Sequence, residues 1–441
     1  MIPNSDIHAV IHLSSTAVYT IVGYFDVHNK KTQVMGLGIA KTDAFFGGQI
    51  INREHLLSAI YKSVREAIDM AGVQVSYVGL SFASPAMKGE NGIHDKIIAG
   101  QQPIGGGKLG RKITHDDIRD VLNEAKSKLG QQERKEVQLC QQRFWLDDDQ
   151  DAKEVVGMLA SKLTASYHLI SIPSMFYAQI KDLLTSNNLE VHPMFFDGIA
   201  SSEYALSADE KQRGVCFIDI GAALTKVCLY QEGVLLYSRC LPVGGQLVDT
   251  DIASTFGLTL LEAESLKKHH GSANTAKQSK SDFITLKKRH HDSELTVHLY
   301  KLASVIEARY LALLNEIFYE LTDKGLNQFM DMGVVLAGGG ADMTDLAGLI
   351  ERQFGVSVRQ MSINTKVAVY TQMMSDENIG LLKTHLFDPK LHSILGALMY
   401  YQSEQYARDE RGQFGEIDGS GLFGHIRKSC QSWLDKLRQL L

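Results

Sequence analysis

A strand–turn–strand pattern occurs twice in this 441-residue chain, and it restricts the possible folds more than any other feature. In the first copy, the apolar runs Ile7–Leu13 and Ala17–Phe25 flank the small turn Ser14-Ser15-Thr16. Residues 213–230 repeat the design, with Gly221-Ala222-Ala223 in the turn. Apolar runs on both sides of such a turn predict a β-hairpin, and two distant copies predict two related halves.

The segments that follow each hairpin are also alike. Another short strand is predicted over Gln33–Ile39 in the first half and over Val234–Leu241 in the second. Helical patterns come later, over Arg53–Ala71 and Gln246–Phe256. The predicted fold class is therefore α/β, with two related halves that each contain a mixed sheet and flanking helices.

Three stretches interrupt this plan. Residues 84–162 contain a glycine-rich loop and an acidic run, and roughly eighty residues without a fold would be unusual in a compact domain. Residues 258–326 are a second insertion candidate, and residues 403–420 have the polar composition of a flexible linker. The predicted division is a first half (1–83 and 163–200), an inserted subdomain (84–162), a second half (201–257 and 327–402), a smaller subdomain (258–326), a linker (403–420) and a terminal helix (421–441).

Composition excludes several functional classes. The formal net charge is −6 and the isoelectric point is near 6.2, so the chain lacks the basic character of a nucleic-acid-binding protein. Five scattered cysteines, none in a C-x-x-C pair, fit neither a disulfide framework nor a zinc site. The N-terminal residues do not resemble a secretion signal, and no segment has the roughly 18 uninterrupted apolar residues of a spanning helix. We expect a cytoplasmic protein that does not cross a bilayer.

Three turns of small residues have the composition of a nucleotide site. Such turns let several backbone N–H groups converge on a phosphate, and Ser14-Ser15-Thr16 and Gly221-Ala222-Ala223 both qualify. Asp219 stands just before the second turn, where a carboxylate can hold Mg²⁺ through water. In VVLAGGGADMTDL, a predicted strand runs into Gly338-Gly339-Gly340, which would let a base or ribose lie against the backbone. Each motif alone is also common for purely structural reasons.

The order of these motifs resembles that of the FtsA-type bacterial cell-division proteins, which have the actin, Hsp70 and sugar-kinase fold. The resemblance covers nearly the whole chain. It rests on the opening strands, the amphipathic end and the segments RGVCFIDIGAALTKVCLYQEGVLLYSRCLPVGGQLVDTDIASTFG, EAESLKKHHG, SVIEARYLALLNEI and MGVVLAGGGADMTDL.

This resemblance implies a ligand, ATP with Mg²⁺, and a set of residues that bind it. Ser14, Ser15 and Thr16 would lie in the first phosphate loop. Glu264 and Lys267 would contact the adenosine beside the three glycines. The full implied nucleotide site is Ser14, Ser15, Thr16, Asp219, Gly221, Ala222, Ala223, Leu224, Thr225, Glu264, Lys267, Gly338, Gly339 and Gly340.

The chain departs from the family pattern at both phosphate loops. It has His12 where the family usually has an aspartate, and Ser14 and Ala17 where glycine and lysine are usual. Ala222, Ala223 and Leu224 replace glycines and a threonine in the second loop. A left-handed backbone at either alanine would cost about 1–2 kcal/mol. We therefore expect nucleotide binding to be weak or lost and hydrolysis to be negligible, so that the protein is not chiefly an enzyme.

The last 21 residues, Gly421 to Leu441, predict an amphipathic helix. Its apolar stripe and its cationic face suit the interface of an anionic membrane, with Trp433 at interfacial depth. The alternative is a terminal helix that packs back on the body, but the preceding linker favours the membrane. The implied contact residues are Leu422, Phe423, Ile426, Arg427, Lys428, Trp433, Leu434, Lys436, Leu437, Arg438 and Leu441.

The resemblance also implies partners. It implies a head-to-tail filament on the cytoplasmic membrane at the division site, which recruits later divisome membrane proteins and binds the C-terminal tail of the tubulin-like GTPase FtsZ. In this chain Glu307 and Arg309 match the motif beside which that tail docks. Arg309 could pair with a tail carboxylate, or it could simply form an ordinary surface ion pair on its own helix.

Two other functions stay open at this point. A type IV pilus assembly ATPase-like protein of the same fold would share the inserted subdomain but should lack the amphipathic end. A sugar or acetate kinase would need a catalytic acid or base, and His12 stands where the usual acid would be.

Overall fold

The computed structural model describes residues 7–75, 77–105, 108–127, 133–147, 150–152, 154–287, 294–372, 374–386, 388–403 and 406. The chain divides into two compact units. The first unit comprises Met1–Tyr204, Val234–Arg239 and Asn364–Leu441, and the second comprises Ala205–Gly233 and Cys240–Ile363.

The first unit is built on a six-stranded mixed sheet with the order β14-β6-β1-β2-β3-β22. β1, β2 and β3 are antiparallel neighbours, whereas β6, β14 and β22 join in parallel. The pairing of β1 with β2 confirms the first predicted hairpin. These strands are β1 (Ile7–Leu13), β2 (Ala17–Asp26), β3 (Lys31–Lys41), β6 (Tyr77–Phe82), β14 (Glu190–Phe196) and β22 (Val367–Val369).

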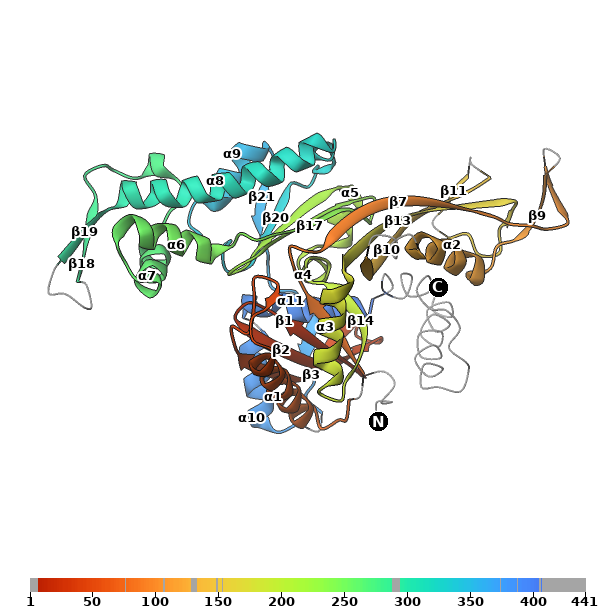
Figure 1. Ribbon diagram of the computed structural model, residues 1–441, viewed down its shortest axis with the longest axis horizontal. Helices are drawn as coiled ribbons and strands as arrows, with labels where there is room; N and C mark the ends of the chain where they lie inside the picture. Colours follow the sequence, from red (N-terminus) through yellow and green to blue (C-terminus); the bar gives the residue numbers. More distant parts are fainter. Residues whose placement is uncertain are drawn as a thin grey trace. The chain divides into compact units, whose positions relative to one another are not determined.

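Two helices pack on this sheet (Figure 1). α1 (Arg53–Ala71) lies on β2 and β3, and α11 (His392–Tyr401) lies on β1 and β2. The side chain of Asn52 caps the first turn of α1. Gly38 allows the close approach of α1, because a Cβ there would lie 1.8 Å from the carbonyl oxygen of Ser63. The shorter elements of this unit are β4 (Phe45–Phe46), β5 (Gln49–Ile50), α3 (Ser174–Thr185), α4 (Asp197–Ala205) and α10 (Asp376–Leu386).

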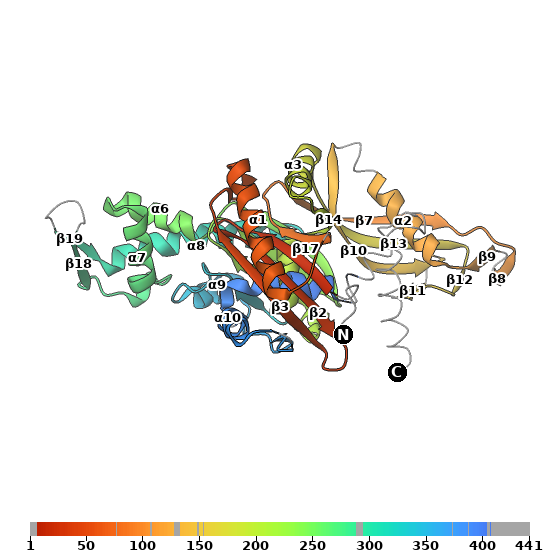
Figure 2. The same cartoon turned by 90° about the horizontal axis from the view of Figure 1, so that it is seen from below.

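The inserted segment forms an antiparallel sheet of its own, with the order β11-β10-β13-β7 (Figure 2). α2 packs on β7 and β13, and a cluster of buried apolar side chains that includes Leu122, Phe144 and Leu163 fills the space between them. A smaller sheet has the order β12-β9-β8. The elements are β7 (Lys88–Ile97), β8 (Gln102–Gly105), β9 (Lys108–Lys112), α2 (His115–Ser127), β10 (Arg134–Leu146), β11 (Gln150–Ala152), β12 (Leu159–Ala160) and β13 (Lys162–Pro173).

The second unit contains a five-stranded sheet with the order β17-β16-β15-β20-β21. β15 and β16 form the second predicted hairpin, and β20 joins β15 in parallel. Burial of every residue of β15 and β20 explains their continuous apolar runs. The strands are β15 (Val215–Ile220), β16 (Thr225–Gln231), β17 (Val234–Leu241), β20 (Val334–Ala337) and β21 (Val358–Gln360).

Helices complete the second unit. The long helix α8 packs against α6 and α9, and α6 packs against α7 (Figure 1). A capping box between Thr259 and Glu262 begins α7. The elements are α5 (Ala208–Arg213), α6 (Gly245–Phe256), α7 (Leu260–His270), β18 (Phe283–Lys287), β19 (Glu294–His298), α8 (Leu299–Asp323) and α9 (Leu346–Phe354).

The two units are coarser than the six predicted segments, so the finer boundaries stay a prediction. The predicted terminal helix, 421–441, and most of the predicted linker lie outside the described residues. Within the part of the chain that the structure describes, no helix is both long and apolar enough to cross a membrane.

Candidate functional site

The turn of the first hairpin uses much of its own hydrogen-bonding capacity. The Ser14 hydroxyl accepts bonds from the backbone N–H groups of Thr16 and Ala17, at 3.3 and 3.2 Å. The Ser14 N–H itself donates to the carbonyl of Ala17 at 3.1 Å. The Ser15 hydroxyl accepts from the N–H of Gly47 at 3.3 Å. The predicted phosphate donors Ser14 and Thr16 therefore have internal acceptors, which a phosphate would have to displace.

His12, two residues before this turn, belongs to a buried polar cluster. Its Nδ1 lies 3.3 Å from the hydroxyl of Ser81 and 3.6 Å from Oδ1 of Asp197. The same Asp197 oxygen accepts a bond from Ser201 at 3.2 Å. Both of these contacts involve the same ring nitrogen, Nδ1, so His12, Ser81 and Asp197 form one packed polar network.

Asp197 brings a carboxylate to within 3.6 Å of the His12 ring. It is the first residue of α4, where an acidic group is favoured by the helix dipole. Sequence reasoning missed this residue because it lies far from His12 along the chain, in a segment without a recognisable motif.

Asp219, just before the turn of the second hairpin, is paired with a lysine. Oδ2 of Asp219 lies 2.7 Å from Nζ of Lys226, and their side chains are 1% and 9% exposed. The two residues stand directly opposite each other in the β15–β16 ladder. A buried carboxylate requires such a partner, because an unpaired buried charge is strongly unfavourable.

These residues do not fit the magnesium site that the sequence predicts at Asp219. The ammonium of Lys226 neutralises the carboxylate, and burial keeps hydrated ions away from it. Among the residues that the structure describes, no group of three or more histidine, cysteine or acidic side chains could hold a metal ion.

The second turn, Gly221 to Leu224, is closed by its own backbone and by the start of α6. The N–H of Gly221 donates to Leu224 at 2.8 Å. The first amides of α6, at Gly245 and Gln246, donate to the carbonyls of Gly221 and Ala222, both at 2.9 Å. The hydroxyl of Thr225 donates to the carbonyl of Val243 at 2.7 Å.

The two alanines of this turn fit its backbone. Neither Ala222 nor Ala223 is among the described residues with positive φ. The free-energy cost that a left-handed alanine would carry therefore does not apply to this turn. The alanine substitutions therefore give no conformational reason for weak nucleotide binding.

The glycines after β20 have different roles from one another. Gly338 has φ 84°, and a Cβ there would lie 2.3 Å from Oδ1 of Asp219. A Cβ on Gly340 would lie 2.6 Å from Cγ2 of Ile220. Gly339, by contrast, has no atom within 4 Å of such a Cβ. Packing against β15 thus accounts for Gly338 and Gly340, and Gly339 remains the candidate for contact with a ligand.

Lys267 reaches the same region of the second unit and pairs there with Asp249. Nζ of Lys267 donates to the carbonyl of Gly245 at 2.7 Å and lies 2.8 Å from Oδ1 of Asp249. Burial raises the pKa of Asp249, and the contact with Lys267 opposes that rise. Glu264 pairs with Lys268 at 2.6 Å and lies close enough to Asp249 to contribute to the rise of its pKa.

Three elements of the predicted nucleotide site meet at the start of α6 within the second unit. A Cβ on Gly245 would lie 3.4 Å from Lys267 Nζ, 3.6 Å from Gly340 Cα and 3.7 Å from the Gly221 carbonyl oxygen. The Tyr310 hydroxyl fixes the third glycine by donating to the carbonyl of Gly340 at 2.8 Å. The second turn, the start of α6, α7 and the glycines after β20 therefore converge on one small region.

The two predicted partner-binding residues on α8 have internal partners. Arg309 binds Asp251 of α6 through two bonds, Nε to Oδ2 at 2.5 Å and Nη2 to Oδ1 at 2.9 Å. This ion pair is about one-third exposed and raises the pKa of the guanidinium. Glu307 accepts a bond from the N–H of Thr275 at 2.9 Å. Any acidic partner would compete with Asp251 for Arg309.

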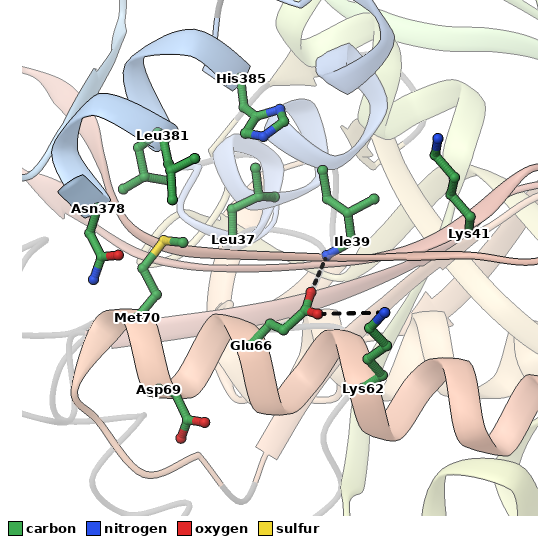
Figure 3. A pocket seen from close by; sticks show the side chains of 11 residues that line it. Leu37, Ile39, Lys41, Lys62, Glu66, Asp69, Met70, Asn378, Leu381 and His385 are labelled. Carbon is green, nitrogen blue, oxygen red and sulfur yellow. Dashed lines mark hydrogen bonds and ion pairs between the residues drawn. The ribbon is translucent and has the colours of Figure 1, made fainter.

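A surface groove of about 860 Å³ lies in the first unit along the outer edge of β3 (Figure 3). In the described ladder, β22 pairs with β3 only at Thr32–Val34, so the edge beyond Val34 is left to other groups. A carboxylate oxygen of Glu66, on α1, accepts the N–H of Ile39 at 3.1 Å. Sequence reasoning missed this groove, because α1, β3 and α10 form it together and no motif marks it. Its lining comprises Leu37, Ile39, Lys41, Lys62, Glu66, Asp69, Met70, Asn378, Leu381, Leu382 and His385.

Solved structures with the same architecture confirm the actin-like fold. A type IV pilus biogenesis complex, PilM-PilN, matches with a TM-score of 0.60 at 16% identity, over 90% of this chain and 98% of that one. MreB5 of Spiroplasma citri bound to ADP matches with a TM-score of 0.53 at 13% identity, over 92% and 99%. At these identities the likeness shows the fold alone.

Curated relatives and family models identify the family. The chain is 30% identical to the cell division protein FtsA of Buchnera aphidicola subsp. Baizongia pistaciae, over 79% of this chain and 84% of the relative. It is 26% identical to FtsA of Escherichia coli K12, over 91% of both chains. The model of cell division protein FtsA matches residues 216–396, and the model of the SHS2 domain inserted in FtsA matches residues 98–171. The chain therefore belongs to the FtsA family of cell division proteins.

Proposed function

We propose that this chain assembles into an actin-like filament on the cytoplasmic face of the membrane at the division site and anchors FtsZ there. One observation carries the proposal: both the FtsA model and the model of its inserted domain match this one chain. Recruitment of later divisome membrane proteins is part of the same proposal.

ATP is the proposed ligand of the actin-like body. Supporting this, the second turn, Lys267 and Gly340 converge within the second unit. MreB5, which has the same fold, has been solved bound to ADP and bound to AMPPNP. Because backbone groups of both turns already have internal partners, we expect the affinity to be low and hydrolysis to be weak or absent.

Membrane attachment is proposed for residues 421–441. This proposal rests on the sequence, because the segment lies outside the described residues. Arg427, Lys428, Lys436 and Arg438 stand against Asp435 alone in an otherwise acidic protein. A single helix of this kind binds lipid reversibly, so stable attachment would require many copies in one filament.

A vesicle flotation experiment tests the anchoring role. We expect the full chain to float with anionic vesicles and to carry fluorescent FtsZ with it. A form truncated before Gly421 should stay at the bottom of the gradient, while a matched variant with Arg427, Lys428, Lys436 and Arg438 changed to glutamine should float less. Undiminished flotation of the truncated form would refute the membrane role. Flotation of the full chain without FtsZ would refute the anchoring role.

Arg309 is the proposed contact for the acidic FtsZ tail. Its guanidinium already binds one carboxylate in a two-pronged geometry, which supports its suitability for another.

The pilus-assembly alternative has the PilM-PilN fold likeness in its favour, but the FtsA and inserted-domain matches favour cell division.

A further inference from the structure

We propose that Lys226 takes the place of a divalent cation beside Asp219, so that nucleotide binding at the second turn does not depend on magnesium. This inference rests on the nucleotide binding proposed above and adds to it that the acid before the second turn is held by a lysine and not by a metal ion.

Both oxygens of Asp219 are buried. Oδ2 lies 2.7 Å from the ammonium of Lys226. Oδ1 lies close to Gly338, because a Cβ added there would come within 2.3 Å of it. Magnesium keeps several of its waters when it binds protein carboxylates, so it needs space around the oxygens that it approaches. A carboxylate that is 1% exposed and enclosed in this way does not offer that space.

The charge balance points in the same direction. A carboxylate that attracts Mg²⁺ carries a net negative charge, but the Asp219–Lys226 pair is neutral. A dication near this pair would meet the ammonium as well as the carboxylate, so the pair offers it no net attraction.

A second lysine–carboxylate pair lies in the same small region. Lys267 Nζ contacts both Asp249 and the carbonyl of Gly245, next to Gly340 and the carbonyl of Gly221. Two ammonium groups that belong to the chain therefore stand at the second turn. A lysine is part of the chain, so a chelator cannot remove it as it would remove a bound metal ion.

The first test measures ATP binding to the full chain by calorimetry, once with magnesium and once with EDTA. We expect the two dissociation constants to agree within about twofold. A loss of more than about tenfold in EDTA would overturn the inference. Absence of ATP binding in both buffers would also overturn it, together with the proposed ligand, whereas vesicle flotation tests the anchoring role independently.

The second test follows Mn²⁺ alone by electron paramagnetic resonance. Lys226→Asp places two carboxylates opposite each other, so this variant should take up Mn²⁺ that the unaltered chain and Lys226→Arg leave in solution. Thermal melting checks that each variant is folded, and Lys226→Arg keeps the test decisive if Lys226→Asp does not fold. Stoichiometric Mn²⁺ uptake by the unaltered chain would contradict the proposal. Uptake by the unaltered chain that Lys226→Arg abolishes would contradict it as well.

Discussion

The two hairpin turns occupy equivalent places in their sheets, but the buried polar residue before each turn is paired in a different way. In the second unit, Asp219 meets Lys226 directly across the hairpin. In the first unit, His12 faces Tyr19 across the hairpin and finds its carboxylate, Asp197, on a helix. A pair within one hairpin forms from local sequence, whereas a pair between β1 and α4 requires the whole unit to fold. The same backbone design can thus carry either arrangement.

The largest effect is expected from Lys226→Met, which breaks the pair of the second turn. Asp219 would lose its ammonium in a buried site, so the free energy of unfolding should fall by about 3–5 kcal/mol. Denaturant unfolding measures the loss. Tyr19→Phe, at the equivalent position of the first hairpin, is the control and should cost less than about 1.5 kcal/mol. The double variant Asp219→Asn with Lys226→Met should lose less than Lys226→Met alone. Equal losses for Lys226→Met and Tyr19→Phe would remove the contrast between the turns.

The first unit should respond to acid through a buried histidine. Burial lowers the pKa of His168 to about 3, and its ring contacts Asn91 and Ser238 at 2.7 and 2.8 Å. Because the unfolded state takes up the proton first, stability is complete above the unfolded pKa near 6.5 and is lost as the pH falls towards 3. Between pH 7 and pH 4 the loss should be about 3 kcal/mol. Unfolding curves at several pH values measure it, and His168→Gln should reduce the slope. An unchanged slope would show that other groups dominate.

A smaller change in stability is expected at the glycines after β20, and it should differ between those that pack against β15 and the one that does not. Gly338→Ala should cost at least about 1–2 kcal/mol, because it adds a methyl group to a left-handed backbone against Asp219. Gly339→Ala should cost no more than about 0.5 kcal/mol, since no atom lies within 4 Å of its Cβ. Thermal melting compares the two. If Gly339→Ala weakens ATP binding while leaving the melting temperature unchanged, Gly339 contacts the ligand. The reverse order of stabilities would contradict the packing roles given above.

The smallest change in stability is expected at the surface ion pair of Arg309. Because this pair is partly exposed, Asp251→Asn should alter the free energy of unfolding by less than about 1 kcal/mol. The same change releases Arg309, so affinity for an acidic FtsZ tail peptide should rise severalfold, and Arg309→Glu should lower it. Fluorescence anisotropy with a labelled peptide measures both, with Glu316→Gln, an exposed acid of the same helix α8, as the control. Identical affinities for Asp251→Asn and Arg309→Glu would exclude Arg309 from the tail site.

Local sequence pattern predicts much of the fold. Both hairpins and the helices over Arg53–Ala71 and Gln246–Phe256 follow from apolar periodicity and turn residues, and the structure confirms them. Few of the ion pairs can be predicted in this way. Lys226 is only two residues beyond the second turn, yet its partner becomes clear only from the strand register.

Contacts between distant segments explain why the partners of other site residues could not be predicted. The orientation of Lys267 depends on Asp249, which comes from another helix. The Arg309–Asp251 pair likewise joins α8 to α6, and Asp197 reaches His12 from α4. Sequence spacing shows which residues share one helix face, but it does not show which neighbouring helix supplies a partner.

The carboxylate of Glu66 at the edge of β3 has a consequence for solubility. An open strand edge can template the addition of strands from other molecules, and this danger grows when many copies are crowded together. By holding the N–H of Ile39 and placing a charge on the edge, Glu66 makes that addition unfavourable. Ordered self-association can then proceed through other surfaces while aggregation through this edge is suppressed.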